Sequence, residues 1–121
     1  MKRLWVVLVV AVLSLTAVAP ALAAPTSGCE HEMAATVESL HHCVKHAADA
    51  GFIDSAGVAK SLLAKVEAAQ RAVDRGQTAV AVAKLRAFVH EVEAQAGKHI
   101  NLEHAQHMAQ HAQMVIEALG G

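Results

Sequence analysis

Three glycines, Gly51, Gly76 and Gly97, divide most of the chain into runs whose apolar residues recur with the period of an α-helix. Glycine often ends a helix because it adopts the left-handed backbone conformation without a steric penalty. The sequence therefore predicts four helices, at residues 31–50, 55–75, 78–96 and 102–119. Only Gly76 and Gln77 separate the second helix from the third, so these two form an antiparallel hairpin.

Each run places its apolar residues on one face. They are Met33, Val37, Leu40 and Val44 in the first run; Val58, Leu62, Val66, Ala69 and Val73 in the second; Ala81, Leu85, Phe88 or Val89, and Val92 in the third; and Leu102, Ala105, Met108 or Ala109, Ala112, Val115 or Ile116, and Leu119 in the fourth. Asp54 or Ser55, Thr78 and Asn101 are the expected N-caps. No segment alternates with period two, so the sequence predicts an all-α fold, a small four-helix bundle.

The N-terminal residues have the pattern of a signal peptide. Lys2 and Arg3 precede an apolar run that begins at Leu4, and Ala21 and Ala23 stand at the small-residue positions of a cleavage site. The apolar run is shorter than the roughly 20 residues that a transmembrane helix needs. We therefore expect cleavage after Ala23, a secreted or periplasmic protein, and no transmembrane segment after processing.

This pattern predicts a signal peptide over residues 1–23, a linker over 24–30 and one helical domain over 31–121. The net charge of the chain is −1 at pH 7, and loss of Lys2 and Arg3 makes it more negative. Nucleic-acid binding needs a basic stripe, which this balance does not supply. The expected partner is therefore an unknown protein or a component of the cell envelope.

Two cysteines, Cys29 and Cys43, would enter an oxidising compartment, where pairing is the usual outcome. On one continuous helix they would lie about 20 Å apart, against a limit of about 7 Å between the Cα atoms of a disulfide. A Cys29–Cys43 disulfide therefore requires the segment around Cys29 to fold back along the helix. Two thiols or an intermolecular bond are the alternatives. A lipoprotein tethered through Cys29 is another, because Gly28 precedes this cysteine as in a degraded lipobox.

Two loop sequences, Gly51-Phe52-Ile53-Asp54 and Gly97-Lys98-His99-Ile100, carry a family resemblance together with Gly76 and the apolar positions of the helices. Over about residues 36–119 the chain resembles the FIMAH domain, a small helical module of secreted bacterial proteins. The resemblance implies an accessory role without catalytic residues. No nucleophile elbow or phosphate-binding loop occurs, so we expect a protein that is not an enzyme and has no cofactor. The usual family arrangement attaches the module to an enzyme, whereas here we expect a free-standing module.

Nine histidines in 121 residues are the one anomaly of composition. Helical spacing places His104, His107 and His111 together on the fourth helix, away from its apolar face, and His42 with His46 on the first. Histidines at i and i+3 or i+4 can bind Zn²⁺ or Cu²⁺ through their ring nitrogens. The simpler interpretation is that they are solvated surface residues. A secreted metal-binding protein is thus the alternative to an accessory binding module.

Lys98 and His99, in the short link between the third and fourth helices, are the best candidates for a polar docking point. A structural interpretation is equally available. A lysine near a helix C-terminus interacts favourably with the helix dipole, and His99 can cap carbonyls at the end of the third helix.

Overall fold

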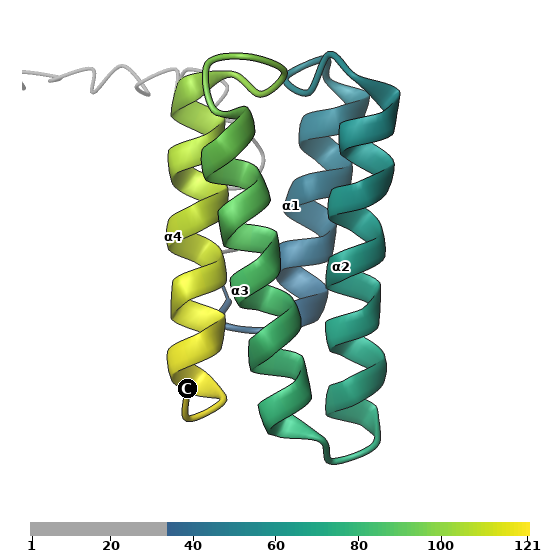
Figure 1. The fold of residues 1–121 in the computed structure, drawn as a ribbon, viewed down its shortest axis with the longest axis vertical. Helices are drawn as coiled ribbons and strands as arrows, with labels where there is room; N and C mark the ends of the chain where they lie inside the picture. Colours follow the sequence, from purple (N-terminus) through teal and green to yellow (C-terminus); the bar gives the residue numbers. More distant parts are fainter. Residues whose placement is uncertain (1–33) are drawn as a thin grey trace, which may run out of the picture.

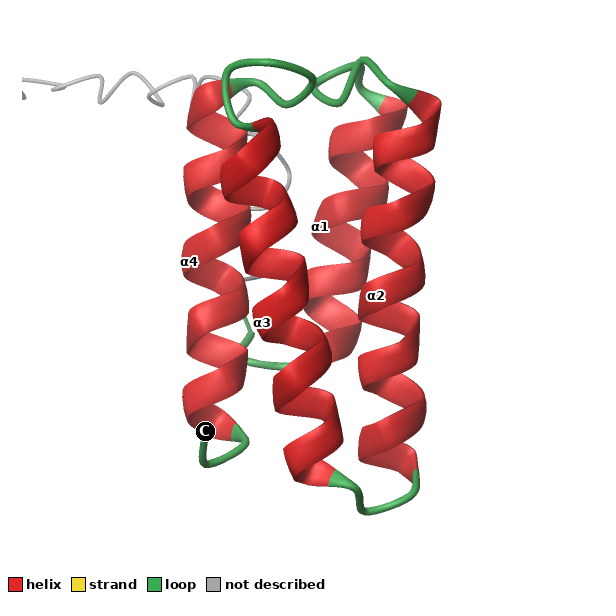
Figure 2. Ribbon diagram, in the orientation of Figure 1, coloured by secondary structure: helices red, strands yellow, loops and turns green. Residues whose placement is uncertain are grey.

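The computed structural model describes residues 34–121 and contains four helices: α1 (Val37–Asp49), α2 (Ala56–Asp74), α3 (Thr78–Gln95) and α4 (Leu102–Ala118). Each helix runs antiparallel to the next and packs against it, and α4 closes the ring by packing against α1 (Figure 1). The connections are short (Figure 2). The predicted all-α four-helix bundle and its hairpin α2–α3 are confirmed. None of the described helices is both long enough and apolar enough to cross a membrane.

The predicted apolar faces meet in a single core. Residues that are at most 3% exposed come from every helix: Leu40 and Val44 from α1, Leu62, Val66 and Ala69 from α2, Leu85, Phe88 and Val92 from α3, and Met108, Ala112 and Val115 from α4. The alanines among them let neighbouring backbones approach closely, which suits a small bundle with little large apolar side-chain volume.

The predicted start of the first helix was too early. Residues 34–36 are not helical, and α1 begins at Val37 because the Thr36 hydroxyl accepts a hydrogen bond from the Ser39 N–H at 3.1 Å. Such a side-chain bond satisfies one of the unpaired donors at a helix N-terminus. Met33 continued the apolar spacing towards the N-terminus and so suggested a longer helix, but it lies outside the described residues.

The other boundaries agree with the predictions to within one residue. Ser55 caps α2 by accepting from the Val58 N–H at 3.3 Å. Thr78 is not the N-cap of α3, because it is already helical and Gln77 precedes it without a side-chain cap. Only residues 75–77 separate α2 from α3, so the turn leads directly into the helix at Thr78.

Alanine substitutions at two glycines, one after α2 and one inside it, should change the free energy of unfolding in opposite directions. Gly76 follows α2 with φ +72°, and no heavy atom lies within 4 Å of an added Cβ, so Gly76→Ala should cost about 1–2 kcal/mol through backbone strain alone. Gly57 lies inside the first turn of α2 and has ordinary space for a Cβ, 3.8 Å from the Ser55 hydroxyl. Gly57→Ala should therefore stabilise the fold by up to about 0.5–1 kcal/mol. Urea denaturation of the two variants measures both, and equal signs would contradict this account.

Candidate functional site

Two loops meet at one end of the bundle, residues 50–55 between α1 and α2 and residues 96–101 between α3 and α4 (Figure 1). We call them the loop pair. The Asp54 N–H donates to the His99 carbonyl and the Asn101 N–H donates to the Phe52 carbonyl, each at 2.9 Å. These bonds flank the antiparallel bridge between Ile53 and Ile100, and the paired residues are 45 to 49 positions apart in sequence. The loop pair is therefore one connected structure.

Buried side chains fix the loop pair to the core. Ile53 is 5% exposed and Ile100 is not exposed at all. The Gln95 carbonyl at the end of α3 accepts from the backbone N–H groups of Lys98, His99 and Ile100 at 3.0–3.1 Å. The C-terminus of α3 is thus capped by backbone groups of the turn. His99 takes part in this capping through its backbone N–H.

The outer side of the loop pair is polar. Asp54, Lys98 and His99 are exposed, and His99 Nδ1 lies 2.8 Å from Asp54 Oδ1. Both side chains of this pair are more than half exposed. Such a pair contributes little to stability, because water screens it. Its effect is to orient the imidazole beside Lys98 on a rigid base.

A shallow hollow of about 380 Å³ lies on the loop pair and reaches Leu102 at the start of α4. The sequence placed Leu102 in the buried face of the fourth helix, but it is 56% exposed. It is the first residue of α4 and lines this hollow beside the two loops. Nearby, the His104 ring stacks on Phe52 with centroids 3.6 Å apart. The surface therefore combines a cation, an imidazole and a carboxylate with exposed apolar area.

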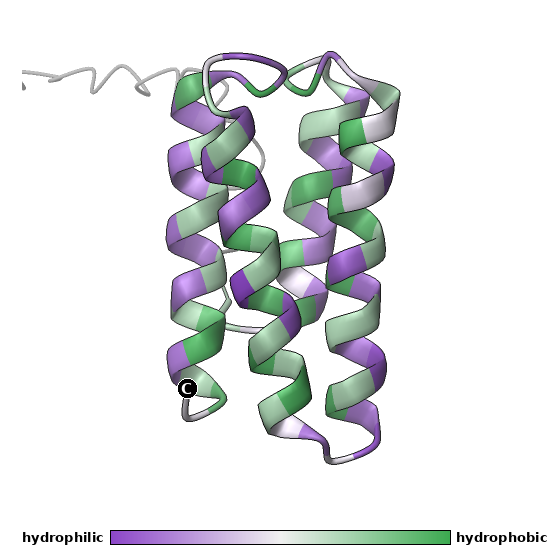
Figure 3. Cartoon of the chain, viewed as in Figure 1, coloured by the Kyte–Doolittle hydropathy of each residue, from purple (hydrophilic) through white to green (hydrophobic). Residues whose placement is uncertain are grey.

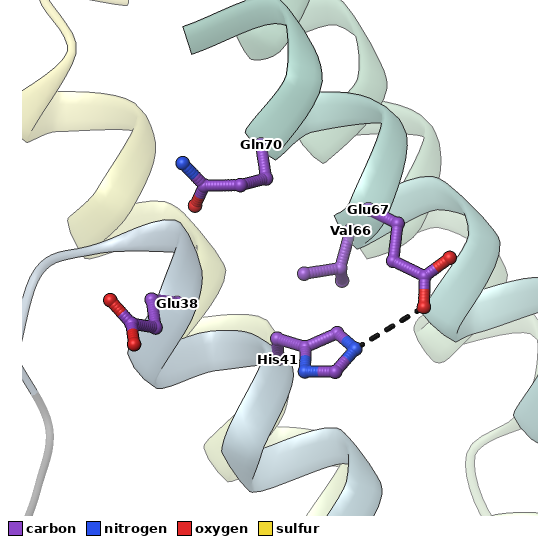
Figure 4. A pocket seen from close by; sticks show the side chains of 5 residues that line it. All are labelled: Glu38, His41, Val66, Glu67 and Gln70. Atoms are coloured by element: carbon purple, nitrogen blue, oxygen red, sulfur yellow. Dashed lines mark hydrogen bonds and ion pairs between the residues drawn. The ribbon is translucent and has the colours of Figure 1, made fainter. Parts of the chain in front are cut away.

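A second hollow, of about 450 Å³, lies between α1 and α2 (Figure 4). His41 Nε2 lies 3.4 Å from Glu67 Oε1, and Glu38 and Gln70 line the same hollow. His41 and Glu67 thus connect α1 and α2 at this hollow. The sequence did not single out His41 as a site residue. Its spacing of three from Glu38 was visible, but the contact with Glu67 depends on the packing of two helices.

The sequence placed His104, His107 and His111 together away from the apolar face of α4, and this is wrong for His111, which is buried. This side chain is 1% exposed, and its Nε2–H donates to the Ala34 carbonyl at 2.8 Å. The buried side of α4 is wide because the helix packs against both α3 and α1, so it includes position 111. His104 and His107 are only partly buried. His111 therefore cannot act with them as a surface ligand.

The remaining histidine prediction concerns α1, where His42 is exposed and His46 is half-buried. Across residues 34–121, no group of three or more histidine, cysteine or acidic side chains is placed to hold a metal ion. The geometry thus gives no support to a Zn²⁺ or Cu²⁺ site formed by His104, His107 and His111 or by His42 and His46.

Several predictions lie outside the described residues. These are the signal peptide 1–23, the linker 24–30 and the lipid attachment at Cys29. Cys43 is buried on α1, at 3% exposure. Because Cys29 is not described, the disulfide between Cys29 and Cys43 stays a prediction.

The chain matches a known protein family. The model of the FIMAH domain matches residues 37–117, more than half of the chain. This range begins at the first residue of α1 and ends in the last turn of α4, so it spans all four helices and the loop pair. Neither the curated proteins nor the solved structures yield a significant match.

Proposed function

The chain belongs to the FIMAH domain family, and we propose that it is a non-enzymatic accessory module whose loop pair binds a partner outside the cell. The observation that carries this proposal is the convergence of two distant segments. Gly51-Phe52-Ile53-Asp54 and Gly97-Lys98-His99-Ile100, the sequences that distinguish the chain most, lie side by side and hydrogen-bonded. A binding role accounts for their exposed side chains, which the core does not need.

The loop pair suits recognition because it is held in place before any partner arrives. Backbone hydrogen bonds join the two loops, and Ile53 and Ile100 anchor them in the core. A surface that is already ordered loses little conformational entropy on binding, so more of the contact energy appears as affinity. Lys98 and His99 then offer donors to acidic or carbonyl groups of a partner, and Leu102 offers an apolar contact.

The proposed location follows from the N-terminal sequence. Removal of residues 1–23 would release the bundle into the periplasm or the medium, where an envelope component or a secreted protein is the partner. The family's accessory character supports this placement. The proposal needs no metal ion and no catalytic residue.

The test is the double variant Lys98→Ala with His99→Ala. Both side chains are exposed, so the melting temperature should stay almost unchanged. Immobilised protein is exposed to an envelope extract of the source bacterium, and mass spectrometry quantifies the retained components. We expect at least one component whose affinity falls about 10-fold, the effect of losing roughly 1.4 kcal/mol of contacts.

The matched control is His42→Ala with Lys60→Ala, which removes the same residue types from exposed positions on α1 and α2. It should retain every component that the unaltered protein retains. If the control and the loop-pair variant lose the same components, or if neither loses any, the loop pair is not the binding surface.

A further inference from the structure

Helix α3 is apolar on two faces. One face enters the core, with Ala81, Leu85, Phe88 and Val92 buried. The opposite face carries Val80, which is 44% exposed, and three exposed alanines. Figure 3 shows that green and pale green, the colours of apolar residues, extend along most of α3. The elements that pack against α3 are α2 and α4, so in residues 34–121 nothing covers its outer side.

The outer residues follow a regular spacing. We call them the outer face of α3, which consists of Val80, Ala83, Ala87, His90 and Ala94. Their separations are three, four, three and four residues, which is the a and d pattern of a coiled-coil seam. Alanine also favours the helix at exposed positions, so the seam is distinguished by its spacing together with the charges beside it. Small residues at most of its positions would let another helix approach closely.

The charged residues beside this seam change from basic to acidic along the helix. Lys84 and Arg86 flank its first half, and Glu91 and Glu93 flank its second half. In heptad terms, Lys84 and Glu91 occupy e positions, and Arg86 and Glu93 occupy g positions. An antiparallel pair of identical helices brings e to e and g to g, so each basic residue meets an acidic residue of the second copy.

The register of the seam agrees with these charges. When Ala87 faces His90 of the second copy and Ala83 faces Ala94, Arg86 comes opposite Glu93 and Lys84 comes opposite Glu91. A parallel pair would instead match Arg86 only with Glu91. The Glu91 carboxylate already binds Lys65 and the Ser61 hydroxyl of its own chain. The exposed pair of Arg86 with Glu93 therefore carries the charge complementarity of the antiparallel arrangement.

We propose that the outer face of α3 is a self-association surface that pairs antiparallel with the same face of a second copy. The two-fold symmetry makes the contact self-complementary and closed. A single pair of short helices buries an area at the low end for protein interfaces, so the dimer dissociates in the micromolar range or above. The loop pair lies at the end of the bundle and stays exposed in such a dimer.

Sedimentation velocity of the purified protein tests this, with a reducing agent present to prevent intermolecular disulfides. The unaltered protein should show a dimer that dissociates on dilution. Ala87→Glu should be monomeric, because in both copies it replaces a small seam residue with a long side chain that keeps the two helices apart. Arg86→Glu alone and Glu93→Arg alone should each weaken association about 5- to 10-fold, since each sets like charges opposite one another. The variant that carries both changes should recover the original association.

The control is Arg71→Glu, an exposed charge reversal on α2 that should leave association unchanged. Circular dichroism checks that each variant is folded, as we expect for substitutions at exposed positions. A protein that is monomeric up to about 0.5 mM would overturn the proposal. So would a dimer that persists in Ala87→Glu, or a double charge reversal that does not recover. Loss of partner capture by the Lys98 and His99 variant tests the loop pair separately, because these residues lie outside α3.

Discussion

Ile100→Ala is expected to lower the free energy of unfolding by about 2–5 kcal/mol, as measured by urea denaturation. The Ile100 side chain is completely buried, although it belongs to a loop. It lies in the bridge between the two loops, where its backbone pairs with that of Ile53. Its truncation removes apolar area from the core and leaves a cavity where the two loops meet. The loss should therefore be as large as for a core residue in a helix.

Leu102→Ala is the matched control, two residues further along. It removes as many carbon atoms as Ile100→Ala, but Leu102 is 56% exposed. We expect a change within about 0.5 kcal/mol. Similar losses in the two variants would contradict the account of Ile100 as the anchor of the loop pair. A large loss only in Ile100→Ala would show that the loops depend on the core for their shape.

The helices were predictable because their signals are local. Apolar residues at helical spacing place the core faces of α2 and α3, and Gly51, Gly76 and Gly97 all have positive φ at the predicted ends. The resemblance to the FIMAH domain rested on the two glycine-led tetrapeptides, and the family match confirms it. A local hydrogen bond also explains why the start of α1 was predicted too early. Thr36 caps α1, although the apolar spacing continues beyond it.

The polar contacts were not predictable, because they join residues distant in sequence. The pairs of Asp54 with His99 and of His41 with Glu67 join residues 45 and 26 positions apart. Helical periodicity says which side of a helix a residue occupies, but not how far burial extends around it. His111 shows this limit. It lies at the edge of the apolar face of α4, and the packing of that helix against both neighbours buries it.

The buried His111 contributes to stability through its volume more than through its hydrogen bonds. Its Nε2–H donates to the Ala34 carbonyl, while its Nδ1 is buried and has no hydrogen-bond partner in the described chain. One satisfied nitrogen adds about 0.5–1.5 kcal/mol, and the unsatisfied one costs about 1–3 kcal/mol. The hydrogen bonding of this ring is therefore no net source of stability. Its volume is, because a side chain that is 1% exposed fills space between helices.

Two substitutions of His111 separate volume from hydrogen bonding. His111→Ala should cost about 2–4 kcal/mol in urea denaturation, because it leaves a cavity and breaks the bond to Ala34. His111→Leu should cost less than about 1.5 kcal/mol. Leucine fills most of the space and removes the unpartnered Nδ1, and the carbonyl of the exposed Ala34 can bond to water instead. If leucine costs as much as alanine, the bond to Ala34 rather than packing is what this histidine supplies, and the segment before α1 depends on it.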